Sequence, residues 1–444
     1  MNNILKSPEL LSPAGTLKNQ RYAMAYGADA VYAGLPRYSL RVRNNDFDQD
    51  NLAIGINEAH VQGKKFFVAA NIMPHGSKLK TFIKDLDPIV GMKPDALIMS
   101  DPGLIMLVRE QWPEMPIHLS VQMNTVNAAA VKFWQGVGLE RIILSRELSL
   151  GEVEDIRQQC PDMELEVFVH GALCIAYSGR CLLSGYFNHR DPNQGTCTNS
   201  CRWDYKLKDG EADAGEAEVV VEFDGSQDFQ AATRNEQAQH VYLLEESQRP
   251  NELMPIEEDE HGTYIMNSKD LRAVEHVHKL VSIGVDCLKI EGRTKSHYYA
   301  ARTTQIYRQA IDDAVAGQEF NPELMGTLES LANRGYTDGF FVRHHSQELQ
   351  RYQENASTSR RQLFVGEING PINNDGMAVV DVKNKIKVGD SLELLTSSGN
   401  TRFELDSMLD MQGNTMQEAP GGGYQVWIPM PVTNGDYGLL AKDI

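Results

Sequence analysis

The sequence predicts an α/β protein, a (β/α)8 barrel of the TIM type followed by a small all-β domain. Short apolar runs rich in β-forming residues recur to about residue 293, helical stretches separate them, and short strands with glycine-containing turns follow from residue 363. Near-continuous apolar strands that alternate with helices are typical of a parallel sheet covered on both faces. Eight such strands over about 290 residues favour a closed barrel, and an open doubly wound sheet is the alternative.

The elements follow each other in a regular order. Eight runs are predicted as barrel strands, at residues 9–15, 30–35, 65–73, 96–103, 117–124, 141–147, 165–171 and 287–293. Helices are predicted between several of them at residues 17–26, 51–62, 104–111 and 127–136, and after the last strand at 296–316 and 322–334. Each strand run ends in polar residues or glycine, as expected where a strand passes into a loop.

An acidic insertion, about residues 205–262, interrupts this pattern between the seventh and eighth strands. Between Asp209 and His261 there are 16 acidic residues against two arginines, a local balance of −14, whereas the rest of the chain has a balance of −5. Within the insertion, residues 219–223 and 240–244 are predicted to form a small hairpin. The total charge of −19 therefore does not exclude a nucleic-acid partner, because the remaining surface can carry a basic patch.

We predict three parts: the barrel at residues 1–340, which carries the insertion and the cysteine cluster, a polar linker at 341–361, and a small β-barrel domain at 362–444. Six strands are predicted in the last part, at 363–368, 378–382, 391–396, 401–405, 425–429 and 437–441. No stretch approaches the roughly 18 uncharged apolar residues of a membrane span. The first residues lack the features of a signal peptide. We therefore expect no membrane partner and a cytoplasmic location.

Polar residues gather at the C-terminal ends of the predicted strands. They are Ser12, Asn71, Ser100, Asp101, Gln122, Asn124, Ser145, Arg146, Glu147, His170, Glu291 and Arg293. Barrels of this type place their active sites at that face. Any one of these residues could simply end a strand, but charged and amide groups repeated at the same end favour a site.

Four of the six cysteines lie within 28 residues, at Cys174, Cys181, Cys197 and Cys201. In a reducing compartment, clustered cysteines are more often metal ligands or catalytic groups than disulfides. Four thiolates complete the ligand set of Zn²⁺ or of an iron–sulfur cluster, and none of the gaps is the C-x₂-C of zinc ribbons. The spacing thus favours an iron–sulfur cluster, with [4Fe–4S] as the expected type. Four thiols that only pack in a core are the alternative.

The cysteine cluster begins where the seventh strand ends, so we expect it on the active face. The other two cysteines, Cys160 and Cys287, are expected to be core thiols. Arginines at predicted loop positions could bind phosphates or another anionic substrate. The candidate substrate-binding residues are Arg41, Arg43, Arg180, Arg202, Arg293, Asn124 and Glu291.

Several long motifs resemble those of the collagenase-like peptidase family U proteins. They occupy residues 10–15 (LLSPAG), 173–184 (LCIAYSGRCLLS), 195–203 (GTCTNSCRW), 267–271 (NSKDL) and 289–296 (KIEGRTKS). The resemblance covers about residues 5–340 and extends to the β-rich C-terminal domain. Residues 191–197 (DPNQGTC) are most similar to the branch of tRNA uridine hydroxylases.

The resemblance implies an iron–sulfur enzyme that forms 5-hydroxyuridine at the wobble position of tRNA, with prephenate as a required metabolite. Relatives hydroxylate a ribosomal RNA cytidine or a ubiquinone precursor. Many members carry a cysteine where this chain has Arg272, so the implied ligand set is the four clustered cysteines. Prephenate is a dicarboxylate, for which bidentate arginine contacts are suited.

Two further functions stay open at this point. The first is the peptidase activity in the family's older name, although the chain lacks an H-E-x-x-H motif, since residues 275–278 read EHVH, and lacks a G-x-S-x-G motif. The second is a non-catalytic, metal-stabilised RNA-binding scaffold. The sequence identifies no catalytic residue and does not predict the oligomeric state.

Overall fold

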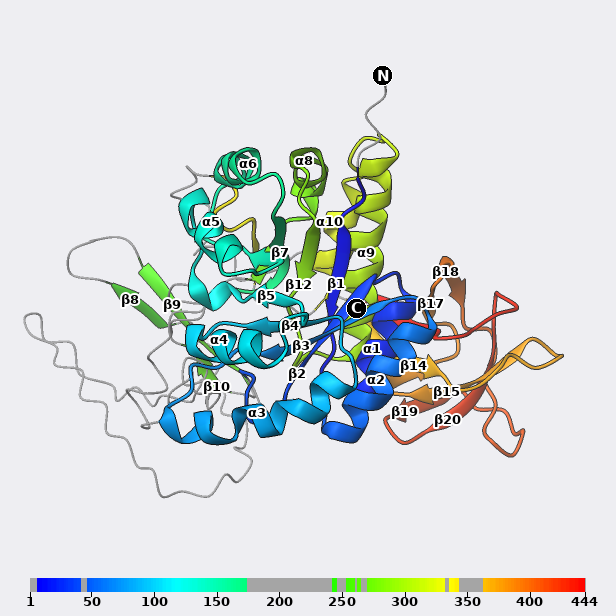
Figure 1. The fold of residues 1–444 in the computed structure, drawn as a ribbon. Helices are drawn as coiled ribbons and strands as arrows, with labels where there is room; N and C mark the ends of the chain where they lie inside the picture. Colours follow the sequence, from blue (N-terminus) through cyan, green and yellow to red (C-terminus); the bar gives the residue numbers. More distant parts are fainter. Residues whose placement is uncertain are drawn as a thin grey trace, which may run out of the picture.

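The computed structural model describes residues 6–40, 46–173, 242–245, 253–259, 262–264, 270–331, 335–342 and 362–443. Within these ranges the chain forms a closed barrel of parallel strands surrounded by helices, followed by an antiparallel all-β region (Figure 1). The predicted fold class is confirmed.

Eight parallel strands make the barrel. They are β1 (Glu9–Pro13), β2 (Ala30–Gly34), β3 (Lys65–Ala70), β4 (Ala96–Met99), β5 (Ile117–Leu119), β6 (Arg141–Ile143), β7 (Glu164–Ala172) and β12 (Cys287–Ile290). The sheet closes because β12 pairs with both β1 and β7: Cys287 is in register with Glu9 on one side and with Glu166 on the other. Strands such as β2 are buried on both faces, which explains their continuous apolar sequences.

Helices cover the outside of the barrel. They are α1 (Leu17–Ala25), α2 (Gln49–Val61), α3 (Gly76–Gly91), α4 (Pro102–Gln111), α5 (Ala128–Gly136), α6 (Leu150–Gln159), α8 (Val277–Ile283) and α9 (His297–Val315), with α10 (Glu323–Glu329) after them. Among the described residues, no helix is long and apolar enough to cross a membrane.

Most of these helices begin at a side chain that caps the first turn by accepting a hydrogen bond from the backbone N–H three residues further on. The capping residues are Thr16, Asp48, Asp101, Asn127, Ser149 and Ser296. Helix α3 differs, because the side chain of His75 makes no capping hydrogen bond.

Several predicted strand runs are longer than the strands themselves, since their last residues start the next element. Strand β4 ends at Met99, because Asp101 already caps α4 and Pro102 is its first residue. After β5, a 3₁₀ turn, η2 (Val121–Met123), ends at Asn124 in the left-handed conformation, with φ 48°. Asparagine tolerates that conformation better than most residues.

Two short strands extend the sheet beyond the barrel. Strand β11 (Asp270–Arg272) pairs antiparallel with the end of β7, and β13 (Tyr336–Thr337) pairs with β11. A 3₁₀ turn, η6 (Val274–His276), leads from β11 into α8. Neither short strand was predicted, because strands of two or three residues carry too few alternations to identify.

In the insertion, β8 (Tyr242–Glu245), β9 (Leu253–Asp259) and β10 (Gly262–Tyr264) form an antiparallel sheet in the order β10-β9-β8. The second half of the predicted hairpin thus overlaps β8, which pairs with β9. The first half, residues 219–223, lies outside the described residues.

The C-terminal region is antiparallel throughout. Its strands are β14 (Gln362–Ile368), β15 (Met377–Val382), β16 (Asn384–Lys387), β17 (Ser391–Thr396), β18 (Gly399–Glu404), β19 (Glu418–Gly421), β20 (Gln425–Pro429) and β21 (Leu439–Asp443). Six of them form one sheet in the order β18-β17-β21-β14-β15-β20, and β16 pairs with β19. Strands β16 and β19 were not predicted.

This region packs beside α1 and α9 (Figure 1). The Tyr26 hydroxyl at the end of α1 donates to the backbone oxygens of Leu395 and Tyr437, each at 2.9 Å. Arg302 of α9 forms a buried ion pair with Glu393, with 3.0 Å between Nη2 and Oε1. Apolar residues of β17 and β21 join the hydrophobic core of the barrel, so the two regions share one interface.

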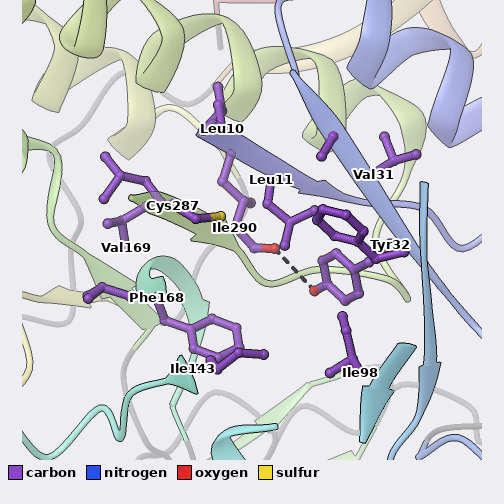
Figure 2. Close-up of a cluster of buried hydrophobic side chains, with 14 of the residues drawn as sticks. Leu10, Leu11, Val31, Tyr32, Ile98, Ile143, Phe168, Val169, Cys287 and Ile290 are labelled. Atoms are coloured by element: carbon purple, nitrogen blue, oxygen red, sulfur yellow. Dashed lines mark hydrogen bonds between the residues drawn. The ribbon is translucent and has the colours of Figure 1, made fainter. Parts of the chain in front are cut away.

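Apolar side chains from different strands meet inside the barrel (Figure 2). Figure 2 shows Tyr32 of β2 beside Ile98 of β4, and Phe168 of β7 beside Ile143 of β6. The Tyr32 hydroxyl donates a hydrogen bond to the backbone oxygen of Ile290 at 3.1 Å. These side chains belong to the hydrophobic core of the barrel.

Candidate active site

A chain of hydrogen bonds joins the loops at the C-terminal face of the barrel. The Leu40 N–H donates to Asn71 Oδ1 at 3.2 Å, and Asn71 Nδ2 donates to Ser120 Oγ at 3.4 Å. Ser120 Oγ in turn donates to Gln122 Oε1 at 3.0 Å. Ser100 Oγ donates to the Asn71 backbone oxygen at 2.9 Å. The loops after β2, β3, β4 and β5 are therefore held in one polar network.

Three buried polar atoms in these same loops have no hydrogen-bond partner within the described part of the chain: Ser39 Oγ, Gln122 Nε2 and Thr125 Oγ1. Their residues are at most 1% exposed. A buried polar group without a partner costs about 1–3 kcal/mol. That cost falls when a ligand supplies the missing hydrogen-bond partner. These three atoms are therefore candidates for hydrogen bonds to a polar substrate.

Arg293 lies at the mouth of the barrel, directly after β12. Its Nη2 donates to the Leu40 backbone oxygen at 2.8 Å, and its guanidinium lies 5.8 Å from the centre of the Tyr32 ring. Gly34 makes room for it, because a Cβ at this position would lie 2.4 Å from Arg293 Nη1. The predicted substrate-binding arginine is thus packed at the active face.

Glu291 and Arg146 form an ion pair across the same face. Arg146 also donates from Nη1 to the Ala172 backbone oxygen at 3.0 Å and lies 3.9 Å from the centre of the Phe168 ring. Gly171 allows the two strands to approach, because a Cβ there would lie 2.5 Å from the Glu291 backbone oxygen. Arg146 therefore connects the ends of β6, β7 and β12.

A network of charged side chains fills the barrel below this face. Lys289 Nζ donates to Glu166 Oε1 at 2.8 Å, and Arg141 Nη1 lies 3.3 Å from Glu166 Oε2. Arg141 also donates to Glu9 at 2.7 Å, and Glu9 binds Lys65 at 2.8 Å. Burial would raise the pKa of Glu9, but the charges of Arg141 and Lys65 outweigh it and lower that pKa.

The network was missed from the sequence, although a signal for it exists. Glu164 and Glu166 alternate with apolar residues in β7, and Lys289 lies between apolar residues in β12. Charged residues at every second position of a barrel strand point to its interior. Lys289 also lies 4.4 Å from the centre of the Tyr32 ring, so Tyr32 separates the ionic network from Arg293.

Two histidines of the barrel strands, His118 and His170, are buried. Burial, with the charges of Arg141, Lys289 and Lys65, lowers the pKa of His118 well below its usual value. Burial lowers the pKa of His170 to about 3, helped by the charges of Arg272 and Lys295.

His170 lies among three tyrosine rings, with ring centres 5.8 Å from Tyr299, 5.5 Å from Tyr307 and 5.4 Å from Tyr336. His170 thus packs against α9 and β13 rather than in the mouth of the barrel.

The structure places three of the predicted site residues: Asn124 at the end of η2, and Glu291 and Arg293 after β12. The remaining candidates lie outside the described residues; they are Cys174, Cys181, Cys197, Cys201, Arg41, Arg43, Arg180 and Arg202. Strand β7 ends at Ala172, two residues before Cys174. Both Cys160 and Cys287 are buried free thiols, as predicted.

Arg272, His276 and His278, which the sequence analysis considered in connection with a metal site or a peptidase motif, contact other protein groups. Arg272 binds Glu329 at 2.6 Å and lies 5.3 Å from the centre of the Tyr336 ring. His276 Nε2 lies 3.3 Å from Asp338, and His278 Nε2 lies 3.0 Å from the Gln318 backbone oxygen. Over the described ranges, no three His, Cys, Asp or Glu side chains are placed to hold a metal ion.

Comparison with known proteins identifies one family over both the barrel and the C-terminal region. Residues 15–351 match the model of peptidase family U32, and residues 360–441 match the model of its C-terminal domain. The "tRNA hydroxylation protein P" of Escherichia coli K12 is 63% identical over 439 residues, which cover 98% of this chain and 97% of that protein.

Two more distant relatives have other names. The "23S rRNA 5-hydroxycytidine C2501 synthase" of E. coli K12 is 29% identical, and the match covers 94% of this chain and 56% of that protein. A "Collagenase" of Porphyromonas gingivalis is 26% identical, with 93% of this chain and 92% of that protein covered.

Proposed function

This chain belongs to peptidase family U32, and we propose that it is an RNA-modifying enzyme that hydroxylates tRNA. The observation that carries the proposal is the 63% identity, over nearly the full length of both chains, to a protein named for tRNA hydroxylation. The polar C-terminal face of the barrel supports an enzymatic role, because active sites of this fold lie at that face.

The proposed reaction forms 5-hydroxyuridine at the wobble position. The resemblance to tRNA uridine hydroxylases supports this choice, and the name of the rRNA relative refers to the same ring position of a pyrimidine. At C4, uracil presents a carbonyl oxygen where cytosine presents an amino group. Among the described residues, Gln122 Nε2 is a donor without a hydrogen-bond partner, and a donor that faced C4 of the base would prefer uracil.

We propose that Cys174, Cys181, Cys197 and Cys201 hold an iron–sulfur cluster, of the [4Fe–4S] type. The donor set fits, since four thiolates complete the ligands of such a cluster, and the segment starts two residues after β7 ends at the active face. A bound cluster supplies redox chemistry. The protein's own groups position the substrate: Arg146 fixes Glu291, and Gly34 lets Arg293 pack at the mouth.

Prephenate is the proposed co-substrate. Its two carboxylates require cationic partners, and Arg293 is a described cation at the barrel mouth. Its Nη2 donates to the backbone oxygen of Leu40, which precedes the sequence candidates Arg41 and Arg43 along the chain. Arginine binds carboxylates through two parallel hydrogen bonds, which gives both strength and orientation.

Nucleoside analysis of tRNA tests the proposal. Cells that lack the gene should lose 5-hydroxyuridine-derived nucleosides, wild type should restore them, and Cys174→Ala should not. Cys160→Ala is the matched control, because Cys160 is a buried core thiol at the C-terminal end of α6. Unchanged nucleosides in the deletion, in a strain without a redundant pathway, would rule out the proposal.

The same strains separate the alternatives. A peptidase or a non-catalytic scaffold would leave the nucleosides unchanged in the deletion. An absorption spectrum after anaerobic reconstitution distinguishes an iron–sulfur cluster, which absorbs visible light, from Zn²⁺, which does not. If Cys197→Ala restored hydroxylation fully, the requirement for all four cysteines would be wrong.

A further inference from the structure

We propose that a basic ridge beside the barrel mouth, formed by Arg37, Lys78, Lys80 and Lys84, binds the phosphate backbone of the tRNA. The inference rests on the proposed function, because it takes tRNA as the substrate. It adds the surface that carries the RNA, which neither the family nor the names of the relatives define.

The ridge belongs to the active face of the barrel. Arg37 lies in the loop after β2, and the lysines are the third, fifth and ninth residues of α3, which follows β3. In parallel barrels, the segments that follow the strands begin at the C-terminal face. The Arg37 side chain is 61% exposed, and Lys80 and Lys84 are exposed and one helical turn apart.

The loop and the helix form one rigid support. The Tyr38 hydroxyl donates to Asp85 at 2.6 Å and lies 2.9 Å from Thr81 Oγ1, and its ring packs edge-on against Phe82 with 5.1 Å between ring centres. Lys78 Nζ donates to the Arg37 backbone oxygen at 3.2 Å. The loop that carries Arg37 and the helix that carries the lysines are therefore fixed relative to each other.

The positive charge of the ridge is only partly neutralised. Asp85 accepts from Arg37 at 2.8 Å, and Asp87 is the other carboxylate of α3. Within the described ranges, Lys80 and Lys84 form no ion pair. Burial, and to a smaller extent the nearby charge of Arg37, lower the pKa of Lys78. The positive end of the α3 dipole adds to the positive charge of the ridge.

Other surfaces of the molecule suit RNA less well. Helices α2 and α4 begin with the carboxylates of Asp48 and Asp101 as caps, so their first turns carry negative charge at the same face. The all-β region, residues 362–443, has five basic and eleven acidic residues. Phosphate contacts supply most of the affinity of a protein for a nucleic acid, which favours the ridge.

The ridge also connects directly to the candidate active site. Three residues after Arg37, the backbone of Leu40 donates to Asn71 and accepts from Arg293. Three residues span at most about 11 Å. A tRNA whose backbone lies on the ridge would thus bring a neighbouring nucleotide to the mouth.

Binding of tRNA to the full-length protein tests the ridge. The double variant Lys80→Gln/Lys84→Gln should weaken binding of a fluorescently labelled tRNA transcript with uridine at the wobble position by about tenfold at about 150 mM salt. The slope of log Kd against log salt concentration should fall by about 1 to 2, because two phosphate contacts are lost. Both side chains are exposed, so the thermal midpoint should stay unchanged.

Lys93→Gln is the matched control. Lys93 is exposed and follows the C-terminal end of α3, about 24 Å along the helix from its first turn, at the opposite face of the barrel. It should bind tRNA like the wild type. If the double variant binds as tightly as the wild type, or if Lys93→Gln loses as much affinity, the ridge is not the RNA surface. The proposed function would still stand after such a result, provided that the wild type hydroxylates tRNA in cells.

Discussion

At the residue scale, Gly34 illustrates how a missing side chain shapes the active face. A Cβ at this position would lie 2.4 Å from both Arg293 Nη1 and Ser39 Oγ. Backbone strain is not the reason for glycine here, because its φ is not in the left-handed region. The reason is the close packing of a cation and a hydroxyl group over the end of β2.

Gly34→Ala should therefore displace Arg293 and reduce tRNA hydroxylation by about 10- to 100-fold, since misplacement of a binding group by about 1 Å is enough for such a loss. The measurement is the 5-hydroxyuridine content of tRNA in complemented cells, together with the thermal midpoint of the purified protein. Gly151→Ala is the control, because a Cβ there meets open space on α6. Full activity of Gly34→Ala would show that Arg293 is not needed in this position.

At the scale of elements, the barrel strands combine an apolar core with an ionic network. In β12, Lys289 turns inward and binds Glu166 of β7, and both residues are at most 3% exposed. Arg141 of β6 shares the same carboxylate. Burial of charges is costly unless they are paired, so these three strands must be correctly aligned for the barrel to close.

Lys289→Met should lower the free energy of unfolding by about 3 kcal/mol, because among the described residues Glu166 then keeps only Arg141 as a charged partner. Urea unfolding followed by circular dichroism measures the change. The control is Lys385→Met, which removes an ion pair to Glu418 whose side chains are 58% and 45% exposed and should cost less than about 1 kcal/mol. Equal effects in the two variants would mean that the buried network adds nothing to stability.

At the scale of the whole molecule, the all-β region is attached to the barrel by a polar contact as well as by apolar packing. Glu367 of β14 lies 2.7 Å from Lys18 of α1, 2.8 Å from His297 of α9 and 3.0 Å from Lys383. Burial would raise the pKa of Glu367, but the close contacts with His297, Lys18 and Lys383 outweigh it and hold that pKa well below its usual range.

This contact should make the stability depend on pH. A carboxylate with a lowered pKa in the folded protein stabilises it above the unfolded pKa of about 4.3, and that contribution is lost as the pH falls below this value. Glu367→Gln should cost about 1–3 kcal/mol at pH 7, and its difference from wild type should shrink towards pH 3. Urea unfolding between pH 3 and pH 7 measures this, with the exposed Glu404→Gln as control. A constant difference across the range would contradict the assignment.

The sequence alone determined the class of fold, because apolar strands and helices alternate in a pattern that each segment carries locally. It also determined the family through long motifs, and the grouping of Asn124, Glu291 and Arg293 at one face, because the ends of parallel strands necessarily meet there. The four clustered cysteines remain a prediction from the sequence.

The tertiary structure decided which way each side chain turns. His170, at the end of β7, packs among tyrosines of α9 and β13, whereas Lys289 and Glu166 pair inside the barrel. Arg37 and the α3 lysines become neighbours only because β2 and β3 are adjacent. Such contacts depend on strand register and on segments far apart in the chain, which no local pattern of residues encodes.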